Sequence, residues 1–214
     1  MPTPYSAHRV PVIAIKGRGA ATAPAHRFAT EARVAFDDGW PKPDGEAAES
    51  GPPPTQVFFE TVKSVIARND SPDIAFDLSI NPYRGCEHGC SYCYARPTHS
   101  YLNLSPGLDF ETRIIAKQNI VEVLRGELGA PRYRPALLNI GSVTDGYQPV
   151  ERELGLTRGV IGVLQACRHP FSLITKGSGV ERDLDLIAPM AAQGLAAVYI
   201  TITTLDAVLA RRME

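Results

Sequence analysis

The chain has 214 residues, of which 44% are hydrophobic and 21% charged, and its formal net charge is −1. This length allows one domain with a sizeable core, and the near-neutral charge gives no support for attraction of the whole protein to nucleic acid or to an anionic membrane. No stretch approaches the ~20 apolar residues that cross a bilayer, and prolines interrupt the N-terminus where a secretory signal needs an apolar run, so we expect a cytoplasmic protein with no membrane partner.

The first quarter of the chain differs in composition from the rest. Residues 1–54 contain nine of the 18 prolines and no long periodic apolar pattern. Such a composition buries too little surface to order itself, and 41–54 in particular is typical of a flexible linker. We therefore expect a Pro-rich, largely irregular N-terminal segment, 1–54, followed by a core domain, 55–214.

After residue 54, short apolar runs alternate with longer amphipathic ones. This pattern predicts an α/β fold whose apolar strands pair in parallel beneath crossover helices. On the helix ending at residue 168, Cys167 falls on the apolar face and is expected in the core. The chain ends at Glu214 within a further expected helix, so the core domain is expected to be incomplete at its C-terminus. The expected helices are 55–68, 110–128, 154–168 and 180–192, and the expected strands are 74–80, 136–140, 171–175 and 196–203.

Three of the four cysteines lie within eight residues, directly after the first expected strand. Cys86, Cys90 and Cys93 have the spacing C-x3-C-x2-C. In a reducing compartment such a group indicates metal rather than disulfides. Three thiolates satisfy three irons of a four-iron cube and leave the fourth open to an external ligand. The alternative is zinc, held by the three cysteines with His88 or His99.

The string Asn81-Pro-Tyr-Arg-Gly-Cys-Glu-His-Gly-Cys-Ser-Tyr-Cys-Tyr94 resembles the signature of radical S-adenosylmethionine enzymes, and within them the subgroup related to spore photoproduct lyase. Further matches to that subgroup are spread along the chain at 16–20, 67–72, 107–112, 144–149 and 174–176. The resemblance implies a partial (β/α)6 TIM-like barrel, of which about four of the six βα units are present. The cluster and its cofactor would then lie at the C-terminal mouth of the strands.

The resemblance also implies roles for individual residues. Cys86, Cys90 and Cys93 would ligate a 4Fe–4S cluster. The other matching positions would bind S-adenosylmethionine: Tyr92 at the adenine, Ser142, Thr144 and Asp145 at the amino group, Lys176 at the carboxylate, and Thr201 and Thr203 near the ribose. Oxygen acceptors suit the ammonium of that cofactor and a cation suits its carboxylate. No side chain is identified as a catalytic acid or base.

The leading hypothesis is therefore an enzyme that reductively cleaves S-adenosylmethionine to a 5′-deoxyadenosyl radical, which acts on an unknown substrate. An electron donor such as flavodoxin or ferredoxin would be its partner. Two alternatives stay open, a truncated non-catalytic remnant that binds a cluster and a zinc-binding structural module. A nucleic-acid role would require a groove formed by Arg84, Arg96 and Arg113.

Overall fold

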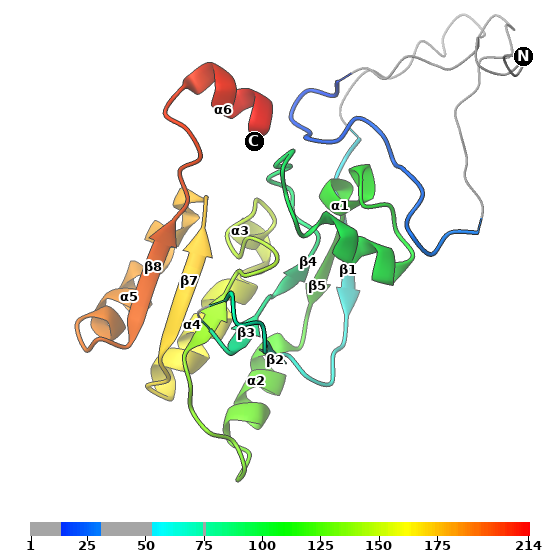
Figure 1. The fold of residues 1–214 in the computed structure, drawn as a ribbon. Coiled ribbons are helices and arrows are strands. Elements are labelled where there is room, and N and C mark those ends of the chain that lie inside the picture. Colours follow the sequence, from blue (N-terminus) through cyan, green and yellow to red (C-terminus); the bar gives the residue numbers. More distant parts are fainter. Residues whose placement is uncertain (1–13, 31–52, 75) are drawn as a thin grey trace, which may run out of the picture.

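The computed structural model describes residues 14–30, 53–74 and 76–214, which form two sheets and their covering helices (Figure 1). The larger sheet has the strand order β2-β3-β6-β7-β8, in which β2 is antiparallel and the other four strands are parallel. The four parallel strands expected from the sequence are thus confirmed, although three of them are shorter than expected. The strands of this sheet are β2 (Ala67–Arg68), β3 (Leu78–Ile80), β6 (Leu138–Ile140), β7 (Phe171–Thr175) and β8 (Ala196–Ile200).

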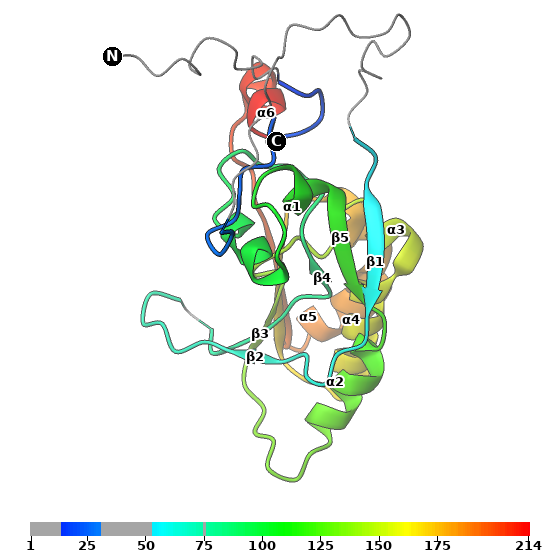
Figure 2. The same cartoon turned by 90° about the vertical axis from the view of Figure 1, so that its right-hand side faces the viewer.

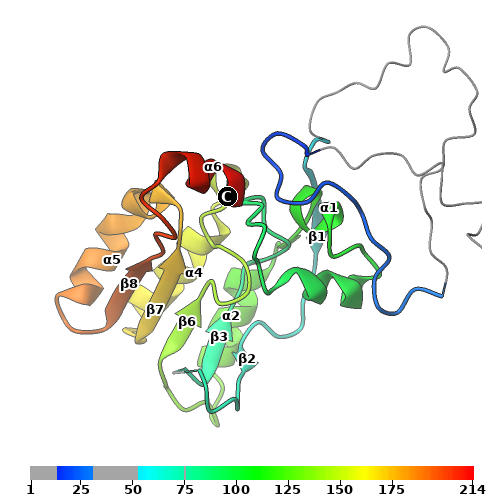
Figure 3. The ribbon, with the colours of Figure 1, turned by 45° about the horizontal axis from the view of Figure 1, so that its top comes forward.

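Three helices cover one face of the larger sheet, as Figure 3 shows: α2 (Ile120–Leu128), α4 (Leu156–Ala166) and α5 (Leu184–Ala191). Each presents an apolar stripe to the strands, and burial of these side chains supplies the main hydrophobic stabilisation of the fold. The side chains packed in this layer include Leu78, Ile80, Leu138, Ile140, Leu173, Ile120, Leu124, Val160, Ile161, Leu164 and Ile187.

The other face of β3, β6 and β7 carries one polar residue at the same register position in each strand. Ser79, Asn139 and Ser172 are partners in the strand register and are all buried. Asn139 Nδ2 donates a hydrogen bond to Ser172 Oγ at 2.9 Å. Side chains alternate between the two faces of a strand, so Leu-Ser-Ile and Leu-Asn-Ile each place one polar residue opposite the helix layer.

A second, three-stranded sheet was not expected from the sequence. It consists of β1 (Gln56–Glu60), β5 (Arg113–Lys117) and β4 (Tyr83–Arg84), with β1 parallel and β4 antiparallel to β5 (Figure 2). The predicted helix 55–68 is therefore wrong. The predicted helix 110–128 is wrong in its first half, where the end of the short helix α1 (Leu108–Thr112) and then β5 precede α2.

Two side chains, one at the N-cap and one in the last turn of α2, explain why residues 61–66 do not continue as a helix. Asn119 Oδ1 accepts the Val62 N–H at 2.9 Å, and Glu127 Oε2 accepts the N–H groups of Val65 at 3.2 Å and Ile66 at 3.0 Å. These donors would otherwise form the hydrogen bonds of a helix. Upstream, the run Val57-Phe58-Phe59 favours a strand once β5 provides a partner.

The remaining elements are short. They are η1 (Arg96–Leu102), α3 (Glu151–Leu154), η2 (Ser178–Asp183) and α6 (Ala207–Met213). The predicted helix 154–168 corresponds to α4, and 180–192 divides into η2 and α5. Because α4 ends at Ala166, Cys167 lies at its C-cap and is exposed, so its expected place in the core is wrong.

Only 14–30, 53 and 54 of the N-terminal segment lie within the described residues, and these contain no helix or strand. The stretch 14–30 packs along η1 and α1, with Leu108 N donating to Thr22 O at 3.0 Å and Ser105 Oγ donating to Pro24 O at 2.6 Å. The expectation of a linker at 41–54 falls mostly outside the described residues. Over the described ranges the strands form no closed barrel, and the partial (β/α)6 barrel stays a prediction.

Candidate functional site

The cysteine loop follows β4 at the C-terminal end of the parallel strands. Gly85 and Gly89 have φ values of +81° and +64°, a conformation that glycine adopts without a steric penalty. A Cβ at Gly85 would lie 2.9 Å from both His99 Cε1 and Phe110 O, so a larger residue would displace the loop. The Cys86 N–H anchors the loop by donating to Phe110 O at 2.9 Å.

The three cysteines of the loop line one cavity of about 320 Å³. Cys86 and Cys90 are buried, Cys93 is half-buried, and none of the three is in a disulfide. Burial raises the pKa of Cys86 to about 12, and it also raises the pKa of Cys90, against the effect of the Lys176 cation. Protein groups alone therefore favour the protonated thiols of Cys86 and Cys90, whereas a bound metal cation would favour their thiolates.

The donor set suits an iron–sulfur cube. Each thiolate of such a cube binds a different iron, so the three sulfurs need not converge on one point. In the described part of the chain, no three Cys, His, Asp or Glu side chains are grouped so as to hold one metal ion directly. His99, one of the two suggested zinc ligands, is fully buried with its Nε2 atom 3.1 Å from Arg113 O, and it does not line the cavity.

The cavity brings together most of the other residues singled out from the sequence. Six of them line it with the three cysteines: Tyr92, Ser142, Thr144, Asp145, Lys176 and Thr201. They come from the cysteine loop, the loop after β6, the end of β7 and the residue after β8. Because β8 ends at Ile200, Thr201 and Thr203 lie just beyond the strand rather than on it, and Thr203 reaches the site through hydrogen bonds.

Lys176 lies at the centre of a polar cluster at one end of this cavity. Its Nζ donates to Tyr92 OH at 2.7 Å, Thr203 Oγ1 at 3.0 Å and Glu214 Oε1 at 2.6 Å. Partial burial disfavours the Lys176 cation, but the bonds to Glu214 and Tyr92 outweigh this effect and raise its pKa. Glu214 has a pKa lowered to about 2, since its bonds to Lys176, Thr203 and Tyr92 outweigh burial. Lys176 thus already binds a carboxylate here, and sequence reasoning had given Glu214 no role.

Asp145 joins the loop after β6 to the end of β7. Its carboxylate accepts hydrogen bonds from Tyr147 N at 2.8 Å, Thr175 Oγ1 at 2.7 Å and Lys176 N at 2.7 Å. The bond from Tyr147 is the local turn expected of an Asp two residues before it. His88 Nε2 lies 3.4 Å from Asp145 Oδ2 and forms no hydrogen bond with the described residues.

Ser142 and Thr144 are held by residues near β3 and β4. Asn81 Nδ2 donates to Ser142 Oγ at 3.2 Å, and Asn81 Oδ1 accepts the Val143 N–H at 2.9 Å. Thr144 Oγ1 donates its proton to Tyr83 O at 3.1 Å, so towards the cavity it can only accept.

Glu111, a buried carboxylate that sequence reasoning missed, supports the cysteine loop through Arg96. Glu111 is fully buried and pairs with Arg96 at 2.5 Å, and Arg96 Nη2 also donates to Cys90 O at 2.8 Å. Since Arg96 is committed here, it is not available for a nucleic-acid groove with Arg84 and Arg113. In the small sheet, Arg84 pairs with Glu60 at 2.8 Å and Arg113 lies over the Phe58 ring.

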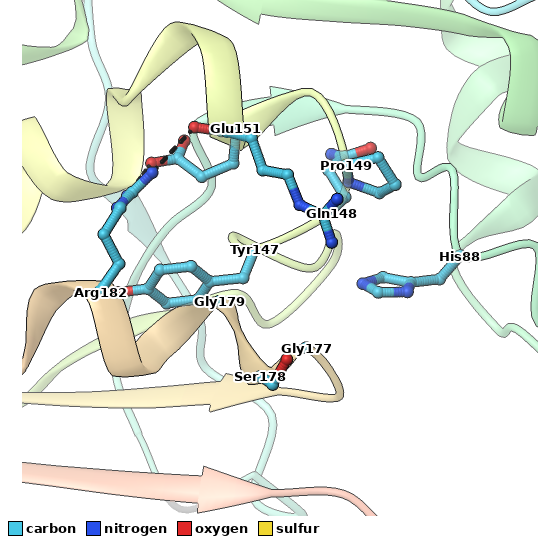
Figure 4. A pocket seen from close by; sticks show the side chains of 10 residues that line it. His88, Tyr147, Gln148, Pro149, Glu151, Gly177, Ser178, Gly179 and Arg182 are labelled. Atoms are coloured by element: carbon cyan, nitrogen blue, oxygen red, sulfur yellow. Dashed lines mark hydrogen bonds and ion pairs between the residues drawn. The ribbon is translucent and has the colours of Figure 1, made fainter.

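A second cavity, of about 360 Å³, shares His88 with the cysteine cavity (Figure 4). Figure 4 shows the His88 ring pointing into it from the side opposite Arg182. Arg182 pairs with Glu151 and with Asp183, each at 2.8 Å. The charge of Arg182 is therefore balanced within the protein.

Comparison with known proteins places this chain beside proteins described only as uncharacterized. One from Mycobacterium tuberculosis and one from Mycobacterium bovis are each 42% identical to it over 161 residues, which are 74% of this chain and 47% of the relative. One from Methanocaldococcus jannaschii is 30% identical over 107 residues, which are 50% of this chain and 38% of the relative. The chain thus spans about half the length, or less, of the curated relatives it matches.

No model of a known protein family matches the chain, and no solved structure matches it. Among the helices of the described residues, none combines the length and the apolar character needed to span a membrane.

Proposed function

We propose that this chain binds a 4Fe–4S cluster through Cys86, Cys90 and Cys93 and belongs to the radical S-adenosylmethionine proteins related to spore photoproduct lyase. When bound, the cluster supplies the electron that cleaves S-adenosylmethionine to methionine and a 5′-deoxyadenosyl radical. The observation that carries the proposal is the single cavity lined by these three thiols together with Asp145 and Lys176, which come from three separate segments of the chain.

The chain's own residues would orient the cofactor. The bond between Lys176 and the Glu214 carboxylate supports Lys176 as the group that receives the carboxylate of S-adenosylmethionine, because Glu214 presents the same chemical group to it. Ser142, Thr144 and Asp145 supply oxygen acceptors on the adjoining wall, which suit its ammonium.

The remaining assignments concern the nucleoside. Tyr92 is 46% exposed and lines the cavity, so its ring is available to contact adenine. Thr201 and Thr203, just beyond β8, would contact the ribose. In this proposal the four parallel strands belong to a partial (β/α)6 barrel, the protein is cytoplasmic, and flavodoxin or ferredoxin is its electron donor.

The decisive experiment compares four cysteine variants after anaerobic reconstitution with iron and sulfide. Cys86→Ala, Cys90→Ala and Cys93→Ala should each lose iron, the visible absorbance of the cluster and the formation of 5′-deoxyadenosine from S-adenosylmethionine under reducing conditions. Cys167→Ala is the matched control and should behave as the unaltered protein, because Cys167 is exposed outside the cavity.

Each other outcome has a distinct meaning. A colourless protein containing one zinc and no iron would replace the proposal with a structural zinc module. A cluster that forms without any 5′-deoxyadenosine would indicate a non-catalytic remnant. Unchanged iron content in any one of the three loop variants would remove that cysteine from the ligand set.

A further inference from the structure

A third cavity adjoins the cysteine cavity on the side of the small sheet. It has a volume of about 310 Å³ and shares Val143 and Thr144 with the cysteine cavity. A molecule bound in it would therefore lie next to the proposed cofactor site. Its other lining residues include Arg84 and Lys117 from the small sheet and Thr98, Tyr101 and Leu102 from η1.

Lys117, the last residue of β5, contributes an ammonium group to this cavity. Within the described ranges, its Nζ forms no hydrogen bond and has no carboxylate oxygen within the 4.0 Å of an ion pair. Burial and the neighbouring Arg84 cation lower the pKa of Lys117 to about 8, against the smaller opposing effect of Glu60. The positive charge of this half-buried ammonium is only partly offset by Glu60. An anion bound in the cavity would supply a negative charge beside it.

Arg84 adds free donors to the same wall. Its Nε bonds Glu60 Oε1 at 2.8 Å, and its two terminal nitrogens form no hydrogen bond with the described residues. Among the described residues, the Lys117 and Arg84 cations are near the single carboxylate of Glu60, which leaves one net positive charge at this wall. A guanidinium whose two terminal nitrogens are free suits a carboxylate or a phosphate.

The Tyr101 hydroxyl, from η1, adds a neutral donor to the lining of the cavity. Tyr101 OH accepts a hydrogen bond from Arg27 Nη2 at 2.8 Å, which leaves the hydroxyl proton free to donate. Leu102 and Val143 are apolar and make the rest of the cavity suitable for a carbon skeleton.

We propose that this cavity binds the anionic group, a carboxylate or a phosphate, of the substrate on which the radical acts, with Lys117 and Arg84 as its binding residues. This inference rests on the proposed function. Only if the cysteine cavity binds S-adenosylmethionine does a molecule beyond the shared Val143 and Thr144 lie next to the radical. It identifies the class of substrate as an organic anion that extends from the small sheet towards the cofactor.

The test uses inorganic phosphate and acetate as probes and follows the acetylation of individual lysines by trace acetic anhydride with mass spectrometry. At matched ionic strength, one or both anions should slow acetylation of Lys117 by about tenfold, the effect of a charge-assisted hydrogen bond worth ~1.4 kcal/mol. Lys63, which is exposed and outside the cavity, is the internal control and should be unaffected. Protection by phosphate alone or by acetate alone identifies which anionic group the cavity takes.

Arg84→Gln provides the second measurement and should weaken the protection of Lys117. Equal protection of Lys117 and Lys63, or protection of neither, would overturn the inference. Protection of Lys117 that is unchanged in Arg84→Gln would also overturn it. The result is independent of cofactor cleavage. Protection of Lys117 without formation of 5′-deoxyadenosine contradicts the proposed function, whereas cleavage without protection contradicts only this cavity.

Discussion

The main-chain N–H of Gly19 donates a hydrogen bond to the carboxylate of Glu111, with 3.0 Å between Gly19 N and Glu111 Oε2. The other oxygen of that carboxylate pairs with Arg96, which in turn holds Cys90 O. One buried acid therefore links the N-terminal segment to the cysteine loop.

Gly19→Ala should disturb the cysteine loop. A Cβ at Gly19 would lie 1.7 Å from Gly89 O, so the N-terminal segment or the loop must move. Overpacking of this kind costs about 1–3 kcal/mol of unfolding free energy, and we expect lower iron content after reconstitution. The control is Gly17→Asn, because Gly17 has open space around it and asparagine tolerates its φ of +76°. Equal iron content in the two variants would contradict the prediction.

Glu111→Gln should destabilise the protein more than the same substitution at an exposed glutamate. The substitution leaves the mostly buried Arg96 cation without its partner, since the Arg96 side chain is only 14% exposed. Breaking such a pair costs about 3 kcal/mol, which urea unfolding measures. Glu153→Gln, at an exposed position of α3, should change the unfolding free energy by less than about 0.5 kcal/mol. A similar small change for Glu111→Gln would show that the pair is not a structural link.

Lys176→Gln should weaken binding of S-adenosylmethionine. Loss of the proposed charge-assisted bond to the cofactor carboxylate corresponds to about a 10-fold or larger increase in Kd. Equilibrium binding measured without a reductant avoids turnover. Lys63→Gln carries the same change of charge at an exposed site and should leave Kd unaltered. If both variants bind equally, Lys176 does not contact the cofactor.

Lys117 should make the unfolding free energy rise with pH. Its folded-state pKa of about 8 lies below the ordinary 10.5, so between these values the unfolded chain binds more protons than the folded one. The contribution of Lys117 to stability therefore increases as pH rises through this window. Urea unfolding across pH 8 to 10.5 should give a more positive slope of unfolding free energy against pH in the unaltered protein than in Lys117→Met. Cys86, Cys90, Tyr83 and Tyr147, whose pKa values are raised mainly by burial, oppose the rise in both proteins alike, so the difference between the two slopes reports on Lys117.

The parts of the structure that the sequence predicted are those with a local pattern. The parallel strands are short apolar runs, and Asp145 and Lys176 follow two of them, so their meeting at one edge of the sheet could be anticipated. Glu111 could not be found in the same way. Its partner Gly19 is 92 positions away, and Arg96, 15 positions away, belongs to no recognisable motif with it. An acidic residue just before a strand is also common at solvent-exposed positions, so Glu111 does not stand out in the sequence.

The small sheet escaped prediction for a related reason. Val57, Thr61, Val62 and Val65 have spacings that fit one face of a helix, and only the presence of β5 makes the β1 segment a strand. Similarly, Asn119 and Glu127 bind backbone groups of 62–66 from about 60 positions away. Such long-range contacts produce no hydrophobic periodicity in the local sequence, so the sequence alone does not reveal them.

The exposed position of Cys167 affects how the protein can be handled. Cys167 lies at the end of α4 that leads into the start of β7, whereas the cysteine loop lies beyond the opposite ends of the parallel strands. A reagent that titrates thiols should therefore react first with a sulfur unrelated to the cavity. In air, an intermolecular disulfide through Cys167 would lower the free thiol content, and this loss could be mistaken for oxidation of the loop cysteines. A Cys167→Ser background separates these two processes, so that any remaining thiol loss reports on the loop itself.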